Sequence, residues 1–351
     1  MLNYILKRLL LMIPTLFGVM LVTFIVTQFV PGGPVEQLIN ELKHQQHMGE
    51  ASVGGTTGLY RGAKGLDEEQ LEQLNTLYGF DQPAYQRFLT MMGNYLTFNF
   101  GDSYIHHQSV LDLIISKLPV SLTLGLWTFF LTYLICIPLG ITKAVRDGSR
   151  FDVITSTVIL FGYAIPNFVL GILLIVLFSG GSFWDIFPLR GLVSDNWHEL
   201  AWHQQILDYL WHITLPIISL MVGNFAVMTM LTKNSFIEEI RKQYVLTARA
   251  KGLSDNVILY KHIFRNAMIP LATSFPAAFI AAFFAGSLLV ETIFSLDGLG
   301  LLSYESVIKR DYPVVLGSLY IFTLLGLFAK LLADISYVLI DPRIQFESIN
   351  Q

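Results

Sequence analysis

The sequence predicts an all-α integral membrane protein with six transmembrane helices. Three observations predict this class: 53% of the 351 residues are apolar, only 14% are charged, and the apolar residues gather in long runs. A soluble domain typically carries about 25% charged residues, whereas an apolar run of about 18 or more residues is typical of a transmembrane segment. Because backbone groups in lipid must bond within their own segment, each run should be helical.

The six runs are each about 20 residues or longer, enough to cross a hydrocarbon core of about 30 Å. Their bounds are Leu9–Val30, Val120–Ile141, Ile154–Phe178, Ile213–Leu231, Leu271–Ile293 and Val314–Ile340. The first run is too long for a signal peptide and lacks a small-residue cleavage site, so we expect it to be a retained helix. Kinks are expected at the prolines within or beside these runs, which are Pro138, Pro166, Pro216 and Pro276.

Lysine and arginine predict the orientation, because cytoplasmic loops carry more of both. With the N-terminus inside, the inner segments hold Lys7, Arg8, Lys143, Arg146, Arg150, Lys233, Arg241, Lys242, Arg249, Lys251, Lys261, Arg265 and Arg343. The short outer loops hold only Arg190, Lys309 and Arg310. Both termini are therefore expected in the cytoplasm.

The predicted organisation has four parts. They are the start and first helix (1–30), an outer loop subdomain (31–119), a five-helix core (120–345) and a tail (346–351). Within the outer subdomain, the Gly-, His- and Gln-rich stretch 43–65 is expected to be flexible. A helical pattern opens at Asp67.

Motifs for catalysis are absent from the sequence. It contains no Gly-x-x-x-x-Gly-Lys-Ser/Thr, Gly-x-Ser-x-Gly or His-Glu-x-x-His pattern, so no catalytic residue is predicted. The spacing of His44 and His47 occurs in metal sites, but their polar surroundings favour ordinary surface residues, and no metal site is predicted. Cys136 is the single cysteine, which excludes an intramolecular disulfide. The near-neutral charge of −4 gives no indication of nucleic-acid binding.

The inner loop 232–270 is the most informative segment. Its pattern predicts a helix that Gly252 ends in a left-handed cap, then a helix capped by Ser254 or Asp255. The second helix should carry on one face Val257, Tyr260, Phe264 and Ala267. Small Ala248 and Ala250 would permit close approach by a partner, and Arg249 and Lys251 offer charge. The alternative is a basic loop that merely follows the inside rule.

The segment from Tyr244 to Pro270, Tyr-Val-Leu-Thr-Ala-Arg-Ala-Lys-Gly followed by His-Ile-Phe-Arg-Asn-Ala-Met-Ile-Pro, resembles the cytoplasmic signature loop of ABC importer permeases of the dipeptide/oligopeptide family. The family's general Glu-Ala-Ala is replaced by Thr247-Ala248-Arg249, as in its peptide branch. Further similar segments are Phe100-Gly-Asp-Ser103, Glu291-Thr-Ile-Phe-Ser-Leu-Asp-Gly-Leu-Gly300 and Arg310-Asp-Tyr-Pro-Val-Val315. Pro31-Gly-Gly-Pro34 and Asp208 to Pro216 are similar to the Yej-type members, which are associated with oligopeptide and microcin C uptake.

This resemblance implies a type I importer fold in a bacterial inner membrane. The chain would pair with a second, similar permease, and a periplasmic substrate-binding protein would deliver a peptide. ATP and Mg²⁺ would be bound by a partner ATPase, with no cofactor in this chain. Residues implicated in docking the ATPase are Tyr244, Thr247, Ala248, Arg249, Ala250, Lys251 and Gly252.

Polar residues within or beside the runs leave alternatives open. Asn167, Asn224 and Thr229 either line a substrate path or form helix contacts. Lys330 and Asp334 are four residues apart and are expected to form an ion pair, the alternative being an ion relay. An outer gate loop, or a simple interfacial connector, is predicted around Glu291, Asp297, Gly298, Gly300 and Tyr304. The alternative functions are an ion-coupled secondary transporter and an intramembrane enzyme.

Overall fold

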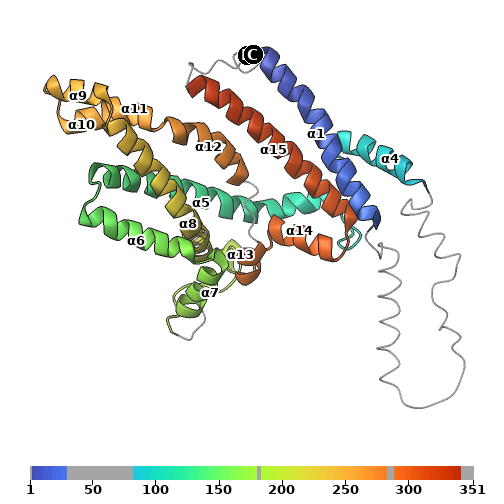
Figure 1. Ribbon diagram of the computed structural model, residues 1–351. Coiled ribbons are helices and arrows are strands. Elements are labelled where there is room, and N and C mark those ends of the chain that lie inside the picture. The colour runs from blue at the N-terminus through green and yellow to red at the C-terminus, as the bar shows by residue number, and fades with distance from the viewer. Residues whose placement is uncertain (1, 30–81, 180–182, 283–287, 341–351) are drawn as a thin grey trace, which may run out of the picture. The chain divides into compact units, whose positions relative to one another are not determined.

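The computed structural model describes residues 2–29, 82–179, 183–282 and 288–340, and every regular element within them is helical (Figure 1). The long helices are α1 (Leu2–Phe29), α5 (Val110–Val145), α8 (Trp202–Ile240) and α15 (Tyr312–Ile340). The shorter ones are α4 (Ala84–Leu96), α6 (Arg150–Ala164), α7 (Asn167–Phe178), η1 (Trp197–Glu199), α9 (Gln243–Ala250), α10 (Asp255–Val257), η2 (Ile258–Ile263), α11 (Phe264–Ala267), α12 (Ile269–Ala282), α13 (Leu288–Ile293) and α14 (Leu299–Ile308). The predictions for 43–65, Asp67 and the tail fall outside these residues.

Four helices in the described part of the chain, α1, α5, α8 and α15, are long and apolar enough to cross a membrane. Two bent pairs raise the number to six if each pair is one span. The pair α6 and α7 bends by 97°, and the pair formed by α10–α11 and α12 bends by 51°. An all-helical chain with four to six spans therefore agrees with the predicted class.

The predicted span Ile154–Phe178 is not one straight helix. Ile165, before Pro166, takes extended backbone angles of φ −87° and ψ 123°, and α7 starts afresh after the proline. Proline lacks an N–H and disfavours helical angles in the residue before it, which explains this break. At Pro138, Pro216 and Pro276 the helices α5, α8 and α12 instead continue.

The chain divides into two compact units. Unit 1 comprises residues 1–10, 116–302 and 324–351, and unit 2 comprises residues 11–115 and 303–323. Unit 1 buries one apolar cluster around Phe236 and Val245 and another around Leu124 and Val290.

Unit 2 joins two segments that lie far apart in the sequence. The buried Asp311 carboxylate accepts hydrogen bonds from the Ser103 hydroxyl and, at 3.1 Å, from the backbone N–H of Tyr104. Rings of Tyr95, Phe100 and Tyr320 pack beside this contact. The Phe-Gly-Asp-Ser and Arg-Asp-Tyr-Pro segments thus form one hydrogen-bonded corner.

The predicted ion pair between Lys330 and Asp334 is wrong. In unit 1, Arg8 Nη2 lies 2.9 Å from Asp334 Oδ2, and the Tyr4 hydroxyl donates to the same oxygen at 3.1 Å. Lys330 is exposed. The spacing of four residues suggested Lys330 as the partner of Asp334. Instead, α1 brings the Arg8 guanidinium to this carboxylate, and Arg8 Nε donates a hydrogen bond to the Tyr4 hydroxyl at 2.9 Å.

A double-mutant cycle should detect this pairing. Arg8→Gln combined with Asp334→Asn should show a coupling free energy of up to about 1 kcal/mol, since the pair is partly exposed. The matched cycle of Lys330→Gln with Asp334→Asn should show none. Thermal melting of the purified protein measures the coupling free energies of the two cycles. Equal values would contradict the Arg8 pairing and support an ion pair between Lys330 and Asp334.

Candidate functional site

The inner loop begins where α8 ends and forms the short helix α9. The N–H of Gly252 donates to Arg249 O at 2.9 Å, and that of Leu253 donates to Ala248 O at 3.4 Å. This pair of bonds is a Schellman cap, which requires a left-handed residue after the helix. Gly252 has φ +80°, so the predicted left-handed cap is confirmed.

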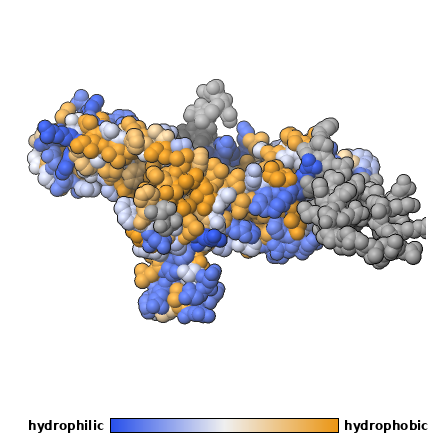
Figure 2. Space-filling view, turned by 90° about the horizontal axis from the view of Figure 1, so that it is seen from below, coloured by the Kyte–Doolittle hydropathy of each residue, from blue (hydrophilic) through white to orange (hydrophobic). Residues whose placement is uncertain are grey.

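One face of α9 is anchored in unit 1. Val245 and Ala248 are buried in a cluster with Ile141, Phe236 and Ile258. The predicted close approach at Ala248 is therefore made within the chain rather than at the surface. The opposite face is exposed, and it comprises Leu246, Thr247, Arg249, Ala250 and Lys251. Figure 2 shows this end of unit 1 as hydrophilic surface beside a broad hydrophobic band.

A polar contact fixes the start of α9 against the end of α8. The Tyr244 hydroxyl donates to Glu239 Oε2 at 2.6 Å, and Lys242 pairs with Oε1 of the same carboxylate. Burial, and then the neighbouring Glu239 carboxylate, raise the pKa of Tyr244. The phenol therefore stays protonated at neutral pH and can hold this hydrogen bond.

The predicted apolar face of the second helix is confirmed only in part. Ala267 is buried and Phe264 packs against the same cluster. Val257 and Tyr260 are exposed, and Ile258 and Ile263 are buried instead. The cause is η2, a π-helical turn from Ile258 to Ile263. A π-helix bonds residue i to i+5, so the buried Ile258 and Ile263 are five residues apart, whereas Ile263 and Ala267 keep the usual spacing of four.

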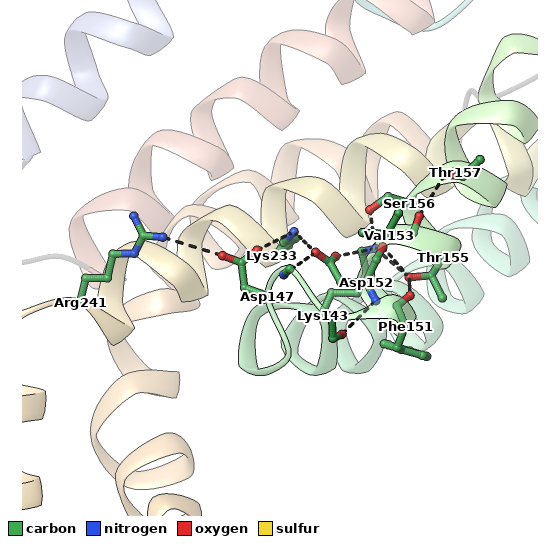
Figure 3. A network of polar contacts seen from close by, with 12 residues as sticks. Lys143, Asp147, Phe151, Asp152, Val153, Thr155, Ser156, Thr157, Lys233 and Arg241 are labelled. Carbon is green, nitrogen blue, oxygen red and sulfur yellow. Dashed lines mark hydrogen bonds and ion pairs between the residues drawn. The ribbon is translucent and has the colours of Figure 1, made fainter.

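A buried ionic network supports the base of the loop, and sequence reasoning missed it (Figure 3). Lys143 of α5 is fully buried, with Nζ 3.0 Å from Asp152 Oδ1. The same ammonium donates to Thr155 Oγ1 at 2.8 Å and to Ser156 Oγ at 2.7 Å. Lys233 of α8 donates to Asp152 Oδ2 at 2.7 Å.

The network continues toward α9. Lys233 Nζ also lies 3.0 Å from Asp147 Oδ1, and Arg241 Nη2 lies 3.8 Å from Asp147 Oδ2. It joins the ends of α5 and α8 to the start of α6. From the sequence, these lysines and Arg241 were predicted only as cytoplasmic charge. The available signal for the network was the pair of aspartates within a basic turn.

Unit 1 also contains a cavity of about 500 Å³ between α5, α7, α8 and α12. Asn167 and Asn224 line it, whereas Thr229 is buried and does not. The other polar side chains on its wall are Thr128, Thr132, Tyr133 and Ser274. Among the described residues that line the cavity, none is charged. The break at Pro166 places Asn167 in the first turn of α7, facing this space.

The outer turn before α14 is built around Glu291, which is fully buried. Its Oε2 accepts the N–H of Leu301 at 2.7 Å, so the carboxylate sits at the positive N-terminus of α14. Ser121 of α5 accepts the N–H of Leu299 at 2.9 Å. An ion pair joins Asp297 to Lys117. Two of the predicted outer-gate residues, Glu291 and Asp297, therefore hold this turn. Tyr304 is half exposed on α14 within unit 2.

Alanine at position 298 should destabilise this turn. A Cβ on Gly298 would lie 2.6 Å from the Glu291 carboxyl carbon, and the buried carboxylate has no free space. Overpacking of this kind costs about 1–3 kcal/mol. Thermal melting of Gly298→Ala should show the loss. Gly326→Ala is the matched control because its Cβ meets nothing within 4 Å; equal melting temperatures for the two variants would contradict the packing described.

No group of three or more His, Cys, Asp or Glu among the described residues could hold a metal ion. His44 and His47 lie outside those residues. The two features that geometry brings forward are thus the anchored helix α9 and the uncharged cavity.

Residues 136–346 match the family model for the binding-protein-dependent transport system inner membrane component. The chain belongs to this family. The match includes α9, Gly252 and the whole inner loop. Members are membrane subunits of ABC transporters, so the chain is a permease subunit and not an enzyme. It is a multi-pass inner-membrane protein.

Full-length relatives agree with this assignment. A permease from Agrobacterium fabrum, the peptidoglycan transport system permease protein YejB, is 58% identical over 98% of both chains. The inner membrane ABC transporter permease protein YejB of Escherichia coli O157:H7 is 54% identical over 98% of this chain and 99% of its own. The oligopeptide transport system permease protein AppB of Bacillus subtilis is 32% identical over 98% and 99%. The predicted resemblance to the peptide family and its Yej-type members is confirmed.

Proposed function

We propose that this permease forms half of an inward path for peptides across the inner membrane. A second, similar permease supplies the other half, and a substrate-binding protein delivers the cargo on the outer side. ATP and Mg²⁺ bind to a partner ATPase. Support comes from the names of the relatives, which assign them to oligopeptide, dipeptide and peptidoglycan transport systems.

The exposed face of α9 is the proposed docking site for the ATPase. Tyr244 fixes the start of the helix, Gly252 fixes its end, and the residues between them present Thr247, Arg249, Ala250 and Lys251 outward. Because Val245 and Ala248 pack against α5 and α8, a movement of the exposed face of α9 is transmitted to these two helices. This is the observation that best supports coupling. The proposal requires the loop and both termini to lie in the cytoplasm, in a type I arrangement of six spans.

The uncharged cavity suits a peptide path. Amide and hydroxyl groups can exchange hydrogen bonds with a peptide backbone, whatever its side chains, and they leave no buried charge to trap the cargo. Asn167 and Asn224 are the proposed contacts. Thr229, which lies outside the cavity wall, is assigned to helix packing.

A competition assay tests the cargo. The permease, co-expressed with its proposed partner permease and ATPase and supplied with the binding protein, should import a labelled oligopeptide into proteoliposomes when ATP is present. Unlabelled oligopeptides or peptidoglycan stem peptides should compete, and the stronger competitor identifies the cargo. A free sugar should not compete. Uptake that no peptide reduces would contradict a peptide path.

A further inference from the structure

Helix α4 of unit 2 carries two apolar faces. Phe88 and Tyr95 are buried, as expected of an amphipathic helix that packs on its own unit. A second stripe is exposed: Tyr85, Leu89 and Leu96 are 65%, 62% and 74% accessible. Spacings of four and seven residues place these three on one side of the helix. A contiguous exposed apolar stripe indicates an interaction surface.

The contact with α1 sets the depth of α4. The Phe88 ring centroid lies 5.4 Å from that of Phe17 and 5.3 Å from that of Phe24. At about 1.5 Å per residue, these positions are about 18 Å and 7 Å from the end of α1 at Phe29. The segment from Leu9 to Phe29 is about as long as the hydrocarbon core is thick. Phe88 therefore lies below the surface of the membrane that α1 crosses.

The contact with α15 gives the same depth independently. The Tyr95 and Tyr320 ring centroids are 5.3 Å apart. Tyr320 lies eight residues into α15, which is about 12 Å from its start at Tyr312. Two helices that are long enough to span thus place both Phe88 and Tyr95 of α4 at membrane depth.

The polar side of α4 has its own surroundings. Arg87 Nη2 donates to Gln28 Oε1 at 2.5 Å, and Arg87, Thr90 and Asn94 line a cavity of about 530 Å³ within unit 2. The polar groups therefore face a polar space, and the exposed stripe is left for a different environment. On α1, Val22, Ile25 and Val26 are likewise exposed.

We propose that α4 is embedded in the leaflet at the Phe29 end of α1, with Tyr85, Leu89 and Leu96 in contact with lipid acyl chains. In the proposed orientation this is the outer leaflet. Helix α4 is then not part of a water-exposed outer subdomain. It faces lipid and packs against both α1 and α15. The test of this proposal depends neither on the transported peptide nor on coupling to ATP hydrolysis.

Spin labelling tests the proposal. In a Cys136→Ser background, single cysteines replace Tyr85, Leu89 or Leu96, and His106→Cys serves as the exposed loop control. The full permease, with its co-expressed subunits, is placed in phosphatidylethanolamine–phosphatidylglycerol nanodiscs. The ratio of collisions with oxygen to collisions with a water-soluble nickel chelate is measured for each label.

The three stripe positions should give a ratio several-fold higher than His106, at a depth of about 7–18 Å below the membrane surface. Bimane at the same positions should also be quenched by lipids brominated on their acyl chains. A ratio equal to that of His106 would show a water-exposed helix. Low collision with both reagents, without quenching, would show that protein covers the stripe. Either of these results would overturn the proposal.

Discussion

Replacing Gly252 by valine should remove most coupling between ATP hydrolysis and transport, while the permease still inserts. Gly252 holds φ +80°, and a Cβ there meets nothing within 4 Å, so the effect is purely conformational. A left-handed backbone costs an L-residue about 1–2 kcal/mol, and a β-branched residue is disfavoured most. This strain lowers the ratio of chains with a formed α9 cap to chains without it by about tenfold, since each 1.4 kcal/mol is one factor of ten. The loss of coupling is measured as the peptide-stimulated ATPase activity of the reconstituted complex.

Gly252→Asn is the matched control for this variant. Asparagine adds a Cβ and polar bulk but adopts left-handed angles far more readily. It should retain most of the coupling that valine loses. If both variants transport normally at normal protein levels, the cap does not position α9. If both fail equally, side-chain bulk in the docking groove, rather than backbone strain, is the cause.

Replacing Lys143 by methionine should destabilise the permease strongly. The ammonium is fully buried and satisfies Asp152, Thr155 and Ser156 together. Asp152 keeps Lys233 on Oδ2, but its Oδ1 and the hydroxyls of Thr155 and Ser156 lose their buried cation. Removal of one partner from a buried ion pair typically costs about 3–5 kcal/mol. At about 2–4 °C per kcal/mol, the melting temperature should fall by about 6 °C or more.

Two variants separate charge stranding from a general effect. Lys143→Met with Asp152→Asn should recover part of the loss, because no carboxylate oxygen then faces the methionine without its cation, while Lys233 keeps Asp147. Arg150→Met, an exposed cation at the start of α6, should melt near the wild-type temperature. A double variant no more stable than Lys143→Met would indicate that packing, and not charge pairing, dominates the site.

The parts of the fold that follow local rules were predictable. Apolar runs located the long helices, and a glycine after a helical pattern gave the left-handed cap at Gly252. Pro166 was expected to disturb its helix, but the 97° bend depends on how α7 packs, which no local rule supplies. The π-turn at Ile258–Ile263 similarly overrides the usual helical period.

Long-range pairings could not be predicted. Asp334 has a suitable lysine four residues away, yet it bonds to Arg8 from the other end of the chain. Asp152 gathers two lysines from α5 and α8, which only packing brings together. Of the predicted path residues, Asn167 and Asn224 meet at one cavity, while Thr229 turns away from it.

The energy source of uptake tests the central claim most directly. The permease and its co-expressed subunits are reconstituted into proteoliposomes. Labelled peptide and the binding protein are added to the outer medium, and the proteoliposomes contain ATP in the lumen or carry an imposed proton gradient. ATP should drive peptide accumulation, and the Gly252→Val complex should accumulate far less peptide under the same conditions. Accumulation driven by the proton gradient without ATP, and unchanged by Gly252→Val, would contradict ATP coupling through α9 and would establish an ion-coupled transporter instead.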